Sequence, residues 1–246
     1  MPMDEERLTK DEKKKIRQEE WKKELDAENK RKIRNKILTW GIGAAILAFA
    51  VWFLVTVVNQ PSPADTTSSI KMPPLTTKDI QIGVPKAKIQ LVEYADFQCP
   101  SCKAYYPIIK KLQIDFQGKM LFVYRFFPLF NIHQNALNSS DAAYAANSQG
   151  KFWEMHDMLF ETQDTWATST TARDIFLQDA AKLGLDIPEF QKDFNNPATE
   201  KFVKDQANAA LDLGLQGTPT FFLNGKIIAL PATYADFKTV LQNAAK

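Results

Sequence analysis

The chain has 246 residues, of which 31 are Lys or Arg, 29 are Asp or Glu and only two are Cys. Its formal net charge of +2 is far from the strongly basic balance of nucleic-acid-binding proteins. A chain of this length with 45% hydrophobic residues can bury a sizeable core and does not need disulfides for stability. The composition therefore excludes a nucleic-acid partner and a small disulfide-stapled scaffold.

The first 36 residues are densely charged, with 13 Lys or Arg and 10 Asp or Glu. They contain no Gly or Pro after Asp4, and acidic residues precede basic ones by four positions, as in Glu19 and Lys23, which favours a helix. The sequence therefore predicts a charged cytoplasmic helix over residues 1–36. A sparse apolar stripe along this helix keeps a partner-binding coiled coil open as an alternative.

An uncharged apolar segment follows at residues 37–58 (ILTWGIGAAILAFAVWFLVTVV). It is long enough to cross a hydrocarbon core of about 30 Å as a helix. Basic residues precede it from Lys30 to Lys36, and none follows until Lys71, which favours a cytoplasmic N-terminus. We expect a single-pass signal anchor in the cell membrane, with the rest of the chain extracytoplasmic. A cleavable signal peptide is the competing interpretation, although its apolar region is normally shorter.

The remaining chain divides into a linker and one domain. Residues 59–80 are rich in Pro, Ser and Thr, which predicts a spacer, and residues 81–246 have the length of a single domain. Apolar patterns in that domain predict the following elements in chain order: a strand over 88–95, a helix over 100–116, a strand over 120–126, a helical insert over about 132–213, a hairpin over 220–229 that turns at Asn224-Gly225, and a last helix capped by Thr233 and Asp236.

Both cysteines lie where the first of these strands gives way to a helix, as Cys99-Pro100-Ser101-Cys102. The first turn of a helix has unpaired N–H groups and a partial positive charge, which favour a thiolate at Cys99. Pro100 suits the first helical turn, and the spacing brings Cys102 into bonding range of Cys99. A bridge over so short a loop contributes little stability. The pattern therefore predicts thiol–disulfide chemistry.

Two other interpretations of the cysteine pair stay open, a zinc site and a structural staple. Zinc needs two further ligands, for which His133 and His156 are the remaining Cys or His residues. A packed histidine is the more ordinary interpretation of His156, and neither histidine is assigned a role. Disulfides persist outside the cytoplasm, so the expected location favours an oxidising function.

Six ordered motifs give the chain from residue 83 onward a resemblance to the DsbA-like proteins of the thioredoxin superfamily. A CxxC pair alone is a weak signal, whereas a pair after a strand, followed by a helical insert and a late Thr-Pro, is far more specific. The motifs are GVP at 83–85, LVEYADFQCPSC at 91–102, YRFFPL at 124–129, GKFW at 150–153, GTPT at 217–220 and NGK at 224–226.

The resemblance implies an α/β thioredoxin fold with an inserted helical domain, here preceded by the expected transmembrane helix. It implies that Cys99 is the nucleophile, that Cys102 is its buried partner, and that Thr218-Pro219 forms a cis-proline loop that binds substrate. It also implies that Glu93 is a buried carboxylate that assists proton transfer at Cys102. A strand carboxylate that faces solvent is the alternative for Glu93.

The chain departs from the best-known oxidase pattern at Ser101, where that pattern has His. Pro100 and Ser101 are expected to tune Cys99, and Ser101 brings no positive charge to the thiolate. We expect a disulfide donor to reduced, unfolded extracytoplasmic proteins, with no cofactor beyond the Cys99–Cys102 disulfide. The resemblance implies reoxidation by a quinone-linked membrane partner that is DsbB-like or similar to vitamin K epoxide reductase. A disulfide isomerase or reductase, and a non-catalytic peptide-binding chaperone module, are the alternatives.

Overall fold

A computed structural model of the chain describes residues 21–23, 30–32, 36, 48–49, 51–53 and 70–246. It divides into two units, Met1–Ser62 and Pro63–Lys246, and the described residues of the first unit are helical and exposed. Within the described residues, no helix combines the length and apolar character needed to span a bilayer. The predicted charged helix over 1–36 and the predicted span over 37–58 lie mostly outside these residues, so both stay predictions.

The second unit is built on a five-stranded sheet in the order β1-β3-β2-β4-β5. Central strands β2 (Ile89–Ala95) and β3 (Met120–Phe126) are parallel, and β4 (Thr220–Leu223) is antiparallel to β2. The two central strands are almost entirely buried, as strands covered on both faces must be. Short β1 (Ile80–Gly83) and β5 (Lys226–Ile227) form the edges.

Helices cover both faces of the sheet. On one face, α3 (Pro100–Asp115) and α10 (Tyr234–Ala244) bury Leu112 and Leu241 against Phe221 of β4. On the other face, α9 (Pro197–Asp212) packs through small residues, Ala207 and Ala210. The predicted strand–helix–strand unit, hairpin turn and last helix are therefore confirmed, including the Thr233–Asp236 capping box. The hairpin is shorter than predicted, because β5 ends at Ile227 rather than at residue 229.

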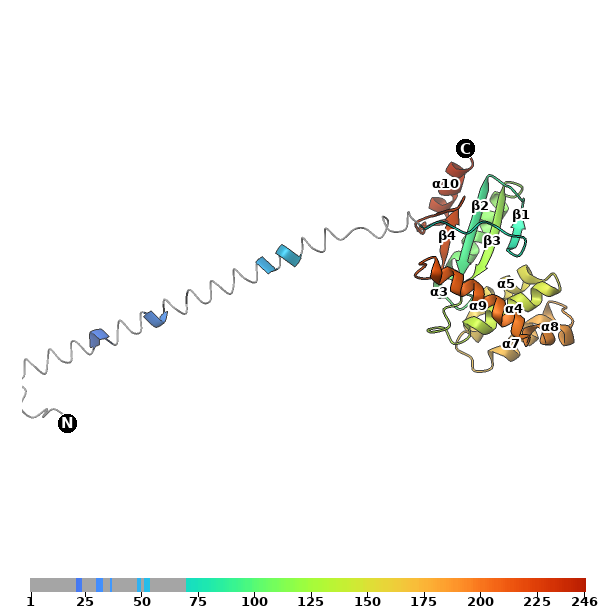
Figure 1. Cartoon of the computed structure of the whole chain (residues 1–246), viewed down its shortest axis with the longest axis horizontal. Coiled ribbons are helices and arrows are strands. Elements are labelled where there is room, and N and C mark those ends of the chain that lie inside the picture. The colour runs from blue at the N-terminus through green and yellow to red at the C-terminus, as the bar shows by residue number, and fades with distance from the viewer. Residues whose placement is uncertain (1–20, 24–29, 33–35, 37–47, 50, 54–69) are drawn as a thin grey trace, which may run out of the picture. The chain divides into compact units, whose positions relative to one another are not determined.

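The predicted helical insert is also confirmed. Its helices run from Ala136 to Asp212, against the expected bounds of about 132–213, and gather into a group apart from α10 (Figure 1). Its buried side chains include Trp166, Phe176 and Phe190, which belong to the same core cluster as Cys99 and Cys102. The insert therefore packs directly against the cysteine pair. Besides α9, it comprises α4 (Ala136–Ser148), α5 (Phe152–Glu161), α6 (Gln163–Trp166), α7 (Ala172–Lys182) and α8 (Ile187–Phe194).

The boundary between linker and domain differs from the sequence prediction, which placed the linker at 59–80 and the domain at 81–246. Strand β1 begins at Ile80, and Lys71 forms an isolated bridge with Lys226 of β5. Ile70 and Met72 pack against the core cluster on the α9 face. The described part of the predicted linker therefore belongs to the domain.

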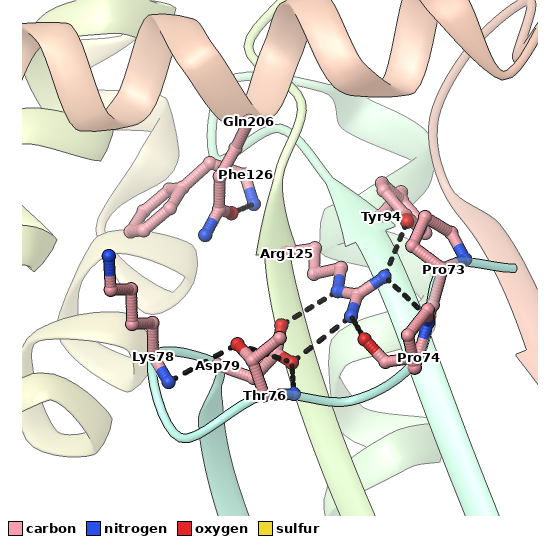
Figure 2. Close-up of polar contacts among 9 residues, drawn as sticks. All are labelled: Pro73, Pro74, Thr76, Lys78, Asp79, Tyr94, Arg125, Phe126 and Gln206. Atoms are coloured by element: carbon pink, nitrogen blue, oxygen red, sulfur yellow. Dashed lines mark hydrogen bonds and ion pairs between the residues drawn. The ribbon is translucent and has the colours of Figure 1, made fainter.

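A single buried arginine explains why this Pro- and Thr-rich stretch is held (Figure 2). The guanidinium of Arg125, on β3, donates to both carboxylate oxygens of Asp79 at 2.8 and 3.1 Å and to the Tyr94 hydroxyl at 2.8 Å. It also donates to the carbonyls of Pro73 at 3.4 Å and Pro74 at 3.3 Å. All five N–H groups of the guanidinium are used. Through these bonds Arg125 attaches Pro73, Pro74 and Asp79 to the domain.

Candidate active site

The fold places the two cysteines between the end of β2 and the first turn of α3. Cys99 is the residue before the helix, with extended backbone angles, and Pro100 is the first helical residue. Both cysteines are free thiols. Cys99 keeps 7% of its surface exposed and Cys102 none. An attacking thiolate from another molecule can therefore reach Cys99 but not Cys102.

The surroundings of Cys99 favour its thiolate. A hydrogen bond from the Cys102 thiol, then the Thr218 side chain and the backbone N–H groups of Cys102 and Ser101, lower the pKa of Cys99 from 9.0 to about 5, although burial opposes them. The donors at the start of α3 are those that the sequence predicts. The Ser101 side chain itself is exposed, so position 101 acts on the sulfur through its backbone.

The pKa of Cys102 shifts in the opposite direction, well above its usual value. Burial is the main cause, followed by the hydrogen bond to Cys99 and the negative charge of Glu93. The two thiols therefore differ sharply in acidity although they are one helical turn apart. At neutral pH the reduced pair holds its negative charge on Cys99 and its proton on Cys102.

Glu93 lies on β2, six residues before Cys99, and only 4% of its surface is exposed. The solvent-facing alternative for this residue is therefore wrong. Burial, and then the charge of Cys99, raise the pKa of Glu93 from 4.5 to about 8. Its carboxyl group holds a proton at neutral pH and can give or accept one near Cys102.

The Thr218–Pro219 peptide bond is cis, as the resemblance implies. The Cys99 sulfur lies 3.4 Å from the Thr218 carbonyl oxygen, so the loop before β4 lies against the sulfur although 119 residues separate the two. The structure therefore brings Cys99, Cys102, Glu93, Thr218 and Pro219 together at one end of the central strands. A role for the Thr218–Pro219 loop in binding substrate remains a proposal.

The two histidines occupy different places. His133 Nδ1 lies 2.6 Å from Asp96 Oδ2, and the backbone carbonyl of Asp96 accepts a hydrogen bond from the Cys99 N–H at 3.1 Å. His156 is buried in an aromatic cluster and contacts Asp157 at 3.0 Å. Burial lowers the pKa of His156, so it is neutral near pH 7. His133, in the segment between β3 and α4, contacts the loop that leads into the cysteines, and His156 is a packed core residue.

A set of buried polar residues around the loop before Cys99 was not predicted from the sequence. The carboxylate of Asp96 accepts from the N–H groups of Gln98 at 2.8 Å and Leu129 at 3.0 Å. The Gln98 side chain accepts from the Asn135 N–H at 2.6 Å, and Gln163 donates to carbonyls of this loop. Asp96 and Gln98 lie inside the cysteine motif, which is the one signal that pointed to them.

Comparison with known proteins agrees with the fold. A family model described as thioredoxin matches residues 75–243. The chain therefore belongs to the thioredoxin family, and within it the helical insert gives the DsbA-like arrangement that the motifs predict. The expected resemblance is confirmed.

Two solved structures illustrate this likeness. Oxidised BdbD from Bacillus subtilis superposes with a TM-score of 0.63 at 21% identity, covering 72% of this chain and 97% of BdbD. Alpha-DsbA1 from Wolbachia pipientis superposes with a TM-score of 0.61 at 23% identity, covering 73% of this chain and 96% of that protein. At these identities the likeness shows the shared fold.

Curated relatives of higher identity are longer proteins. Na(+)/H(+) antiporter NhaA 1 of Mycolicibacterium gilvum is 34% identical over 189 residues, which are 75% of this chain but 30% of that protein. NhaA 3 of Salinispora tropica is 35% identical over 144 residues, 58% of this chain and 21% of the relative. The chain thus spans less than a third of these relatives, whose name describes the whole of each longer protein.

Proposed function

We propose that the chain is a membrane-tethered, extracytoplasmic thiol:disulfide oxidoreductase that donates the Cys99–Cys102 disulfide to reduced, unfolded proteins. The opposed acidities of the two thiols carry this proposal. The pKa of Cys99 is lowered to about 5, whereas that of Cys102 is raised. A sulfur that is stable as a thiolate is a good leaving group, and this makes the disulfide easy to reduce.

The donation takes two exchange steps. A substrate thiolate attacks Cys99 Sγ, the Cys99–Cys102 bond breaks, and its electron pair goes to Cys102, which then takes up a proton. Glu93, protonated at neutral pH because its pKa is about 8, is placed to supply that proton. A second substrate thiolate then attacks the substrate sulfur of the mixed disulfide, and Cys99 leaves as a thiolate. The substrate loses two electrons and the reduced enzyme holds them.

The size of the pKa shift of Cys99 supports transfer of the disulfide from the enzyme to its substrate. At pH 7, lowering the pKa of Cys99 from 9.0 to about 5 stabilises the reduced pair by about 2.7 kcal/mol, since one pKa unit is worth about 1.36 kcal/mol. For a two-electron couple this corresponds to a potential about 60 mV more oxidising. The shift favours a disulfide donor over a reductase.

Other residues have supporting roles in this proposal. Pro100 starts α3 at Cys99, and the N–H groups of Ser101 and Cys102 stabilise the thiolate. The Thr218–Pro219 loop, which lies against Cys99, binds the backbone of an extended substrate. The reduced pair passes its two electrons to a quinone-linked membrane partner that is DsbB-like or similar to vitamin K epoxide reductase, as the family resemblance implies. The uncharged segment 37–58 and the basic residues before it support the tether.

Single cysteine variants test the chemistry. We expect Cys99→Ser to abolish oxidation of a reduced model protein. We expect Cys102→Ser to accumulate a mixed disulfide with the oxidised model protein, because its Cys99 thiolate attacks the disulfide of that protein, one substrate sulfur leaves as a thiolate, and Cys102 is missing to resolve the product. Equilibration of the wild-type pair with glutathione gives its potential. A potential as reducing as that of thioredoxin, about −270 mV, would favour the reductase alternative. Peptide binding without any oxidation would favour the chaperone module.

Protease accessibility tests the tether. Protease added to intact spheroplasts should remove the domain and spare the first 36 residues, if residues 37–58 span the membrane with the N-terminus inside. Detergent-permeabilised cells provide the control, in which both parts become accessible. Protection of the domain in intact spheroplasts would contradict the topology and the extracytoplasmic location.

A further inference from the structure

One buried side chain of the helical insert holds the backbone of the nucleophilic cysteine. Gln163, the first residue of α6, is 4% exposed. Its Nε2 donates to the carbonyl of Phe97 at 2.6 Å and to the carbonyl of Cys99 at 3.1 Å. Both acceptors lie in the loop between β2 and α3, and 64 residues separate Gln163 from Cys99.

Neighbouring bonds tie the same loop to the same part of the insert. Gln98 Nε2 donates to the Ala167 carbonyl at 2.6 Å. Asn135 Nδ2 donates to the carbonyls of Trp166 at 3.0 Å, Ala167 at 3.2 Å and Ser169 at 2.9 Å. Together these bonds join the cysteine loop and residues 163–169 into one network. Within that network, Gln163 is the residue whose side chain reaches the Cys99 peptide group.

The position of that peptide group decides where the Cys99 sulfur lies. The Cys99 carbonyl accepts the first bond of α3 from the Lys103 N–H at 3.1 Å, and the sulfur faces the N–H groups of Ser101 and Cys102. A donor from Gln163 on the same carbonyl fixes the plane of the Cys99–Pro100 peptide. Without it, a buried carbonyl loses a partner and the peptide is free to turn toward another one.

We propose that Gln163 is a positioning residue, through which the helical insert holds the Cys99 sulfur against the helix N–H groups that stabilise its thiolate. This inference rests on the proposed function of the pair and assigns the insert a part in setting its reactivity. The titratable groups beside Cys99 are Cys102 on α3, Glu93 on β2 and Tyr124 on β3. The nearby Lys103–Asp164 ion pair, at 2.6 Å, joins α3 to α6. All of these groups are unchanged by a substitution at position 163.

The test is Gln163→Met, which keeps the size of the side chain and removes the amide. Its matched control is Gln149→Met, because Gln149 also bridges two insert segments, with bonds to the backbone of Asp186 at 2.8 and 3.0 Å. The full chain is titrated by thiolate absorbance near 240 nm, and the rate of alkylation by iodoacetamide is measured below the titration midpoint. Thermal unfolding of both variants is recorded in parallel.

We expect Gln163→Met to raise the pKa of Cys99 and slow alkylation between about three- and tenfold at acid pH, because a rise of one unit lowers the thiolate fraction tenfold. Gln149→Met should lose stability without moving the midpoint. An unchanged midpoint in Gln163→Met, whatever its stability, overturns the proposal. If Gln163→Met does not fold, the same titration is carried out on Gln163→Asn, which keeps an amide but is one methylene shorter. A raised midpoint is expected there too, and an unchanged one overturns the proposal.

The titration separates this inference from the proposed function, since it needs neither a protein substrate nor a reoxidant. A shifted midpoint in an enzyme that oxidises no substrate would support the positioning role and contradict the disulfide donor. An unchanged midpoint in an active oxidase would contradict the positioning role alone.

Discussion

Two neighbouring residues of β2, Glu93 and Tyr94, face opposite sides of the sheet. Each belongs to a buried region that contains ionisable side chains, and the two regions differ in how those side chains are paired. On one side, Arg125 and Asp79 form an ion pair at 2.8 Å in which the side chains are 8% and 5% exposed. On the other side, Glu93 is equally buried, and its pKa is raised to about 8. The Arg125–Asp79 side therefore contains a buried ion pair, whereas the carboxyl group of Glu93 on the other side is protonated and neutral at pH 7.

The difference comes from the partners and not from the depth of burial. Each guanidinium N–H of Arg125 has an acceptor, so the buried charge is compensated. Burial is the main cause of the raised pKa of Glu93, and the charge of Cys99 adds to it. A buried carboxyl group without a cation exchanges protons near neutral pH. Paired charges hold the domain together in the first region, whereas in the second the protonated Glu93 lies beside the cysteines, where the proposed function uses it.

The largest expected change in stability comes from removing the Arg125–Asp79 ion pair. Arg125→Met leaves the Asp79 carboxylate buried without its cation, and we expect the free energy of unfolding to fall by about 3–5 kcal/mol. Urea denaturation measures this loss. Lys201→Met, which removes an exposed pair with Asp205, is the control and should change little. A loss from Arg125→Met as small as that of the control would show that the ion pair does not hold the domain.

A substitution of Glu93 is expected to change the free energy of unfolding in the opposite direction. The pKa of Glu93 is about 8 in the folded protein against 4.5 for the free side chain, so folding is penalised increasingly as the pH rises from about 4.5 to about 8. Glu93→Gln should remove this penalty and stabilise the fold at pH 7 by roughly 3 kcal/mol.

Denaturation from pH 4 to 9 measures this effect, in a background carrying Cys99→Ser and Cys102→Ser so that no thiol titrates. This background keeps burial, which is the main cause of the raised pKa of Glu93. Parallel curves for the two proteins across that range would contradict the buried, protonated state of Glu93. In the otherwise unchanged enzyme, we expect Glu93→Gln also to slow the step that requires protonation of Cys102.

The smallest expected effect concerns the pKa of Cys99, on the Glu93 side of the sheet. Ser101→His adds a group that can carry positive charge near the thiolate, but the side chain at this position is exposed. We therefore expect the pKa of Cys99 to fall by less than about one unit and the potential to become more oxidising by less than about 30 mV. Thiolate absorbance and glutathione equilibration measure the two shifts, with Ser101→Gln as the uncharged control. An unchanged midpoint would show that the imidazole does not act on the sulfur.

Local signals in the sequence were sufficient for most of the fold. Apolar patterns predicted β2, β3 and α3, because these elements bury regular sets of side chains. The hairpin was readable from Asn224-Gly225, whose positive φ angles of 51° and 81° suit the predicted turn. The cysteine pair was readable from its spacing at a strand–helix junction.

The missed features depend on contacts between distant parts of the chain. Strand β1 has one buried residue, Ile80, among four, so it has no alternating pattern to detect. Arg125 is a charged residue in an apolar strand and Gln163 is one polar residue among others, and each finds its partners at least 31 residues away. Single-sequence patterns carry no record of such pairings.

Residues 70–72 set the length of the tether in the proposed membrane-anchored enzyme. They join the chain to the domain, because Ile70 and Met72 pack against its core and Lys71 bridges to β5, which leaves 11 residues between position 58 and Ile70. Such a stretch reaches at most roughly 40 Å even when fully extended. The cysteine pair would therefore be confined to a thin layer next to the bilayer, where newly exported chains first emerge. It would encounter its substrates by diffusion in two dimensions along the membrane and not in three.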